Sequence, residues 1–164
     1  MEDKQKAIDE IIRSIIIHAK ESWEGDYKIA NKHFKSYTKA ICKLIAEGDI
    51  DIISILIENE EPSVQSAGAY YLLPINKKYA EKKLKSLSRK NENGVGLSAK
   101  TVLNVWKGGN LKFPRLVDNA IVYFTQKELI ARGILSDSGG IAAGRRASNI
   151  VECLHSLLLK VRPK

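Results

Sequence analysis

The side chains that most often carry catalysis or bind metals are few in this chain and widely spaced. The three histidines are His18, His33 and His155, and the two cysteines, Cys42 and Cys153, belong to no paired motif. The histidines lack the spacing of metal ligands. His33 and Cys42 are separated by about 13 Å along one continuous helix, which is too far for a direct hydrogen bond. We therefore predict no catalytic residue, no metal site and no cofactor.

A lysine-rich segment, residues 77–90, is the strongest candidate for a binding site. Its cations could neutralise several phosphates, which would give salt-dependent, sequence-independent affinity for nucleic acid. The alternative, which we favour, is a solvated helix face on which Glu81 pairs with residues four positions away. The candidate nucleic-acid or anion-binding residues are Lys77, Lys78, Lys82, Lys83, Lys85 and Arg89, together with Arg145 and Arg146 further along the chain.

Net charge is +8, and it is unevenly distributed along the chain. Residues 1–75 hold nine Lys and Arg against thirteen Asp and Glu, a balance of −4, and residues 76–164 hold eighteen against six, a balance of +12. A basic half beside a mildly acidic half suits an acidic partner, nucleic acid or head-to-tail self-association. The charge distribution alone does not distinguish among these three kinds of partner.

Most of the first 110 residues place apolar side chains at helical spacing. One stripe runs from Ile8 to Trp23 and a second from Ala30 to Leu44, with Gly25-Asp26 between them. This periodicity predicts two amphipathic helices, and the short link predicts that they form an antiparallel hairpin. Asp26 is the expected N-cap of the second helix.

Shorter elements follow in the middle of the chain. Residues 49–59 are rich in β-branched side chains, but an isolated strand would leave its backbone groups unpaired, so we predict a short buried helix. Pro62 suits the first turn of the next helix, in which Gly68 is small where a neighbouring helix must approach closely. Asn76 is the expected cap of the lysine-rich helix.

Aromatic side chains offer a candidate ligand groove. Trp106 and Tyr71 occupy inward helical positions, so core packing is the favoured interpretation for both. Tyr70 lies just off the apolar stripe and is therefore the candidate groove residue.

Several motifs carry a resemblance to known helical proteins. The segment from Pro62 to Leu73 resembles the first helix of a HEAT-type repeat, although Gln65 stands where such repeats commonly carry Arg. The span from about Ile8 to Leu111 is similar to a small bacterial family of uncharacterised HEAT-like helical proteins, a domain of unknown function. The shared motifs are Gly25-Asp26-Tyr27, Leu72-Leu73-Pro74, Leu97-Ser98-Ala99-Lys100 and Trp106-Lys107-x-Gly109. The resemblance implies a stack of helical hairpins and brings no activity with it.

The last third of the chain differs in pattern. Leu116 to Phe124 suits a helix, although the run Ala-Ile-Val-Tyr-Phe-Thr from Ala120 would also serve as a strand. A strongly amphipathic helix is expected near the end of the chain. Its apolar face would pack on its own domain, pair with a second copy or lie on a membrane surface. The docking or oligomerisation residues of this helix are Ile150, Val151, Leu154, Leu157 and Leu158.

These patterns predict an all-α protein with a HEAT-like helical domain over residues 1–110 and a C-terminal extension over residues 111–164. We expect a non-enzymatic, cytoplasmic, bacterial protein-interaction module that binds a protein partner and is a candidate homo-oligomer. The alternative function is non-specific nucleic-acid binding through residues 77–90. We expect no membrane partner, and no apolar run approaches the roughly 18 residues that would span a bilayer.

Overall fold

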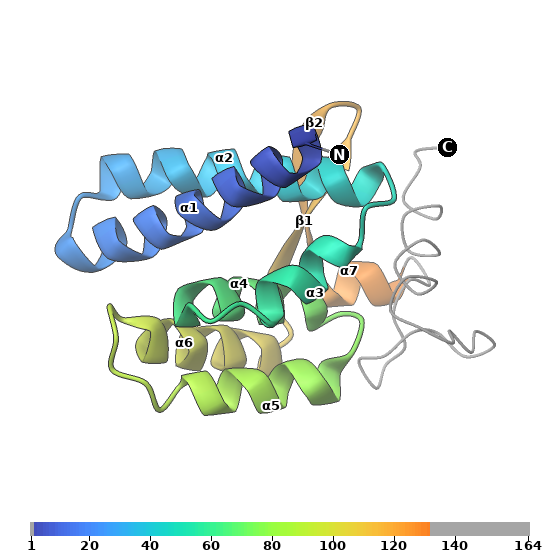
Figure 1. Ribbon diagram of the computed structural model, residues 1–164. Helices are drawn as coiled ribbons and strands as arrows, with labels where there is room; N and C mark the ends of the chain where they lie inside the picture. Colours follow the sequence, from blue (N-terminus) through green and yellow to red (C-terminus); the bar gives the residue numbers. More distant parts are fainter. Residues whose placement is uncertain (1, 132–164) are drawn as a thin grey trace.

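The computed structural model describes residues 2–131. Over that range the protein is mostly helical, with a single two-stranded sheet near its end (Figure 1). Arg145, Arg146 and the predicted docking helix with Ile150, Val151, Leu154, Leu157 and Leu158 lie outside the described residues.

The first two helices form the predicted hairpin. Helix α1 spans Glu2–Glu24 and helix α2 spans Tyr27–Ala46. They run antiparallel beside one another in Figure 1. Gly25 turns the chain between them with a φ of 94°, a value that glycine adopts without steric cost. The carboxylate of Asp26 accepts a 3.1 Å hydrogen bond from the backbone N–H of Ile29, which confirms Asp26 as the N-cap.

Four shorter helices follow and pack in consecutive pairs. Helix α3 (Asp51–Ile57) packs on α4 (Pro62–Leu72), and α5 (Lys77–Leu87) packs on α6 (Val95–Lys107). The β-branched segment is thus a short buried helix, as predicted. Pro62 begins α4, and the side chain of Asn76 accepts a hydrogen bond from Tyr79 N at the start of α5, so both of these predictions are confirmed.

A small β-hairpin is added to the helices, so the protein is mostly helical, as predicted, without being purely α. Strands β1 (Lys112–Val117) and β2 (Ala120–Thr125) pair antiparallel, with Phe113 opposite Phe124. Asp118 and Asn119 link them at φ values of 48° and 62°. Two consecutive residues with positive φ match the twist of a two-residue hairpin, and Asp and Asn tolerate this conformation better than most residues. The β-branched and aromatic run of β2 therefore forms a strand because it has a partner.

The hydrophobic core continues from the helices into this hairpin. Phe113 is fully buried, with its ring centroid 5.3 Å from that of Tyr70 in α4 and 5.8 Å from that of Trp106 in α6. Strand β1 also packs against α2. Leu129 of the last described helix, α7 (Gln126–Ala131), belongs to the same core cluster. The β-hairpin thus joins the α1–α2 layer to the α3–α6 layer (Figure 1).

Candidate binding groove

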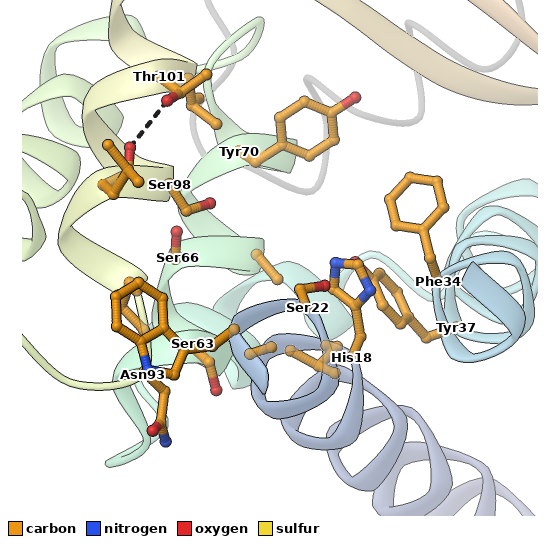
Figure 2. Close-up of a pocket in the computed structure, with 18 of the residues that line it drawn as sticks. His18, Ser22, Phe34, Tyr37, Ser63, Ser66, Tyr70, Asn93, Ser98 and Thr101 are labelled. Atoms are coloured by element: carbon orange, nitrogen blue, oxygen red, sulfur yellow. Dashed lines mark hydrogen bonds between the residues drawn. The ribbon is translucent and has the colours of Figure 1, made fainter. Parts of the chain in front are cut away.

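A groove of about 530 Å³ lies where the α1–α2 hairpin faces α4 and α6. Figure 2 shows side chains from these four helices around it. Among the described residues that line the groove, none is Lys, Arg, Asp or Glu. The groove therefore offers apolar surface, aromatic rings and neutral hydrogen-bonding groups, and its own lining offers no fixed charge with which to hold a phosphate.

One wall of the groove is aromatic and comes from α1 and α2. The ring centroid of His18 lies 5.4 Å from that of Phe34 and 5.7 Å from that of Tyr37, and the latter two rings are 5.5 Å apart. The tilted and edge-on geometry is the arrangement that aromatic quadrupoles favour. These three rings form a rigid surface, because helix-to-helix packing holds the elements that carry them.

One ring nitrogen of His18 forms a hydrogen bond within the protein. Its Nδ1 lies 3.0 Å from the carbonyl oxygen of Ala30. Because a carbonyl oxygen only accepts hydrogen bonds, Nδ1 carries the hydrogen, and in the neutral ring Nε2 is left as an acceptor. His18 can thus accept a hydrogen bond from a ligand N–H or O–H group.

The opposite wall carries hydroxyl groups. Ser63 and Ser66 come from α4, and Ser98 and Thr101 come from α6 (Figure 2). Thr101 donates to the carbonyl of Leu97 in its own helix at 2.9 Å, and Ser63 donates to a carboxylate oxygen of Glu61 at 3.3 Å. Ser66 and Ser98 carry hydroxyl groups that rotate to donate or accept. This wall is suited to neutral polar groups.

Two large apolar side chains of the groove lining are exposed. Trp23 is 60% exposed and Leu97 is 67% exposed, although both line the groove. The indole of Trp23 lies over Gly94, since a Cβ atom added there would lie 2.7 Å from its Cε3. The contact joins the end of α1 to the turn before α6. Exposed apolar side chains beside a concave surface are a common feature of binding sites.

Tyr70, the candidate groove residue, lines this groove. Its hydroxyl donates to the backbone carbonyl of Lys112, and its ring stacks on Phe113. Burial raises the pKa of Tyr70, as it does those of Tyr37 and Tyr71. These phenols stay neutral in the physiological range, so their hydroxyl groups serve as hydrogen-bonding groups.

The buried thiol of Cys42 lacks the features of a nucleophile. Burial raises its pKa from 9.0 to about 11, against a smaller lowering effect of Arg115. A thiol becomes reactive through a lowered pKa and exposure, and Cys42 is buried. Within residues 2–131 no group of three or more His, Cys, Asp or Glu is placed to hold a metal ion.

The cationic residues on α5 lie away from the groove lining. Lys78, Lys82, Lys85 and Arg89 are exposed, and Lys77 and Lys83 are half-buried. The ion pairs that we expected from Glu81 do not form. Its Oε1 instead accepts a 2.9 Å hydrogen bond from the indole Nε1–H of Trp106, and no described carboxylate lies within 4.0 Å of these α5 cations.

Sequence reasoning did not identify most of the groove. His18 and Phe34 belong to apolar helical stripes and gave no separate signal. Leu97 did give a signal, because it is a large apolar residue at a position outside the buried face of its helix.

No family model matches the chain, and neither a search of curated proteins nor a search of solved structures finds a similar protein. None of the described helices is both long and apolar enough to cross a membrane.

Proposed function

We propose that the protein is a non-enzymatic interaction module, and that the groove binds an uncharged, apolar segment of a partner protein. The observation that carries this proposal is the exposure of Trp23 and Leu97 beside the groove. Full burial of one large apolar side chain contributes about 1.5–3 kcal/mol. Trp is also among the residues that contribute most to binding energy in protein interfaces.

The residues that line the groove indicate which partner side chains it can bind. Because it carries no fixed charge, a partner side chain such as Leu, Phe or Trp enters without leaving a buried charge unpaired. The hydroxyl groups of Ser66 and Ser98 and the Nε2 atom of His18 can meet the polar backbone of the entering segment. A volume of about 530 Å³ accommodates a few side chains.

The buried thiol and neutral phenols near the groove support a binding role over catalysis, since neither Cys42 nor Tyr70 is activated. The likeness to HEAT-type helices is part of the same proposal, because stacked helical hairpins commonly present concave surfaces to partners. Self-association through Ile150 and its neighbours, a bacterial source and a cytoplasmic location remain predictions from the sequence.

Selection from a random-peptide library tests the groove directly. We expect the selected peptides to contain Leu, Phe or Trp anchors, and Trp23→Ala and Leu97→Ala each to weaken their binding at least tenfold. Tyr79→Ala is the control, since Tyr79 is an exposed aromatic residue on α5 that does not line the groove. Equal loss in the control and groove variants, or selected peptides dominated by charged residues, would count against the proposal.

A second candidate function is sequence-independent nucleic-acid binding through α5. It is favoured by the absence of described carboxylates within 4.0 Å of the α5 cations. Retention of a random DNA duplex at low salt, its loss at high salt and its reduction in Lys78→Gln/Lys82→Gln/Lys85→Gln would support this function. No retention by the wild-type protein at low salt would eliminate it.

A further inference from the structure

The groove between the α1–α2 hairpin and helices α4 and α6 leaves apolar surface open in the part of the chain that the structure describes. Trp23 is 60% exposed and Leu97 is 67% exposed, and both line the groove. Among its described lining residues there is no Lys, Arg, Asp or Glu. An occupant that matches this surface brings several apolar side chains and few charges, because a charge buried here would have no partner.

The chain itself contains a segment of this composition beyond the described residues. Residues 147–158 hold one Asp, Glu, Lys or Arg among twelve residues, which is Glu152, whereas these four residue types make up 28% of the whole chain. The segment is thus nearly uncharged in a protein whose net charge is +8. Its charge matches that of the groove lining.

The apolar side chains of segment 147–158 have helical spacing. In the helix that the sequence predicts there, each residue is rotated by about 100° from the one before it. Glu152 then falls on the face opposite the apolar stripe. The stripe consists of Ile150, Val151, Leu154, Leu157 and Leu158.

The chain between α7 and segment 147–158 is long enough to reach the groove. The start of α7 lies beside the end of α6, since a Cβ atom added at Gly109 would lie 3.5 Å from Cε of Lys127. The groove is lined by the first part of α6, from Val95 to Val102. The thirteen residues of α6 and the six of α7 together measure about 30 Å. The fifteen residues from 132 to 146 can span at most about 50 Å, which exceeds this distance.

We propose that segment 147–158 occupies the groove of its own chain and competes there with the partner. This inference rests on the proposed function, since it takes the groove to be a site for apolar segments. The apolar stripe covers Trp23 and Leu97, and Glu152 on the opposite face stays in water. A partner binds only when the segment is released, so the chain limits its own affinity for partners.

Covalent linkage favours the segment of the same chain over that of a second copy. A linker that can span two sites gives the tethered segment an effective concentration on the order of millimolar at the groove. A second copy competes only when its own concentration approaches that value.

Disulfide trapping in the full chain tests where segment 147–158 lies. The segment contains Cys153, and the other cysteine of the chain, Cys42, is buried in the helical core. A thiol introduced at the groove can therefore be trapped by Cys153 on mild oxidation with oxidised glutathione. Three single variants place a thiol in the groove lining from three different helices: Ser22→Cys, Ser66→Cys and Ser98→Cys.

The matched control for trapping is Ser86→Cys, an exposed serine of α5 that does not line the groove. We expect at least one groove variant to form a disulfide with Cys153 inside a monomer, at least about tenfold faster than the control. Equal rates at the groove and at position 86, or no disulfide at any groove position, would overturn the proposal. A disulfide-linked dimer as the main product would also overturn it, because the occupant would then be a second copy.

A synthetic peptide of residues 147–158 measures the competition. Leu154→Gln/Leu158→Gln in the full chain disrupts the apolar stripe and opens the groove. We expect the peptide to bind this variant at least about tenfold more tightly than it binds the wild-type chain, whose groove is occupied. Ser148→Gln/Ser156→Gln changes the other face of the predicted helix and should bind the peptide as the wild type does. Equal peptide affinities for the wild type and Leu154→Gln/Leu158→Gln would contradict the competition.

Failure of this inference is distinguishable from failure of the proposed function. If library peptides bind the groove of the wild type and of Leu154→Gln/Leu158→Gln equally, and no groove disulfide forms, only the occupation by segment 147–158 is wrong. If the groove disulfide forms but the variant with the open groove selects no library peptide, partner binding is wrong and the occupation stands.

Discussion

The backbone of Gly68 in α4 passes so close to that of Ile57 in α3 that a Cβ atom at position 68 would lie 2.5 Å from the Ile57 amide nitrogen. Only glycine permits this approach without a shift of one helix. The contact fixes the packing of α4 against α3, and α4 carries Ser63, Ser66 and Tyr70 into the groove. A residue outside the groove thus positions one of its walls.

Gly68→Ala should lower the free energy of unfolding by about 1–3 kcal/mol, because the added methyl group meets backbone atoms that cannot rotate away. Chemical denaturation measures this change. Gly108→Ala is the matched control, since the nearest atoms to its added Cβ lie at an ordinary 3.6 Å. If the two alanine variants are equally stable, the close approach of α3 and α4 is wrong.

Glu81→Ala should destabilise the protein by about 1–3 kcal/mol, because it leaves the indole N–H of buried Trp106 without its acceptor. Glu81→Gln should cost less, since its amide oxygen can still accept the hydrogen bond. Thermal unfolding of both variants distinguishes this role from a purely electrostatic one. An electrostatic role of Glu81 among the lysines would make the two substitutions equally costly.

Stability should fall as pH rises above about 9, with Cys42 as one cause. The pKa of its thiol is 9.0 ordinarily and about 11 in the fold. Between these values the unfolded state releases the proton while the folded state keeps it, so each increase in pH favours unfolding. Above pH 10 the buried tyrosines, whose pKa values are also raised, act in the same direction.

Urea denaturation between pH 8 and pH 10 in wild type and Cys42→Val measures the thiol contribution. The wild-type protein should lose more stability than the variant between pH 9 and pH 10. Parallel pH curves for the two proteins would show that Cys42 is not buried in the manner described.

Asn119→Gly should stabilise the β-hairpin by about 0.4–1 kcal/mol, because glycine adopts the positive φ of this turn residue without strain. Asn119→Val should destabilise it, since a β-branched residue at positive φ is strained. Denaturation of both variants measures the difference. The opposite ranking would mean that the turn between β1 and β2 has another geometry.

Local sequence patterns predict much of the helical architecture for a physical reason. Apolar spacing fixes which helix face is buried, and caps such as Asp26 and Asn76 act within one turn of their own position. The sequence alone does not decide the β-hairpin, because the run from Ala120 suits either a helix or a strand until a partner strand is known. The burial of Arg115 is equally hard to predict from the sequence. Arg115 pairs with Val122 in the hairpin and is only 8% exposed, and this burial lowers the pKa of its guanidinium group.

The groove was beyond prediction because it forms between helices that are distant in the sequence. His18, Tyr37 and Ser98 have no common pattern, and only the packing of α1–α2 over α4 and α6 brings them together. The sequence predicts ion pairs between Glu81 and lysines of its own helix, but Glu81 instead accepts a hydrogen bond from Trp106 of the neighbouring helix. Contacts between helices depend on packing geometry, which helical periodicity does not encode.

Calorimetric titration of a selected apolar peptide into two arginine variants tests peptide binding by the groove most directly. Ser98 and Ser86 are both exposed helical serines, but only Ser98 lines the groove. Ser98→Arg should weaken binding at least tenfold, because it places a bulky charge where an apolar side chain enters, and Ser86→Arg should leave the affinity unchanged. Equal affinities for the two variants would contradict the assignment of the groove as the binding site.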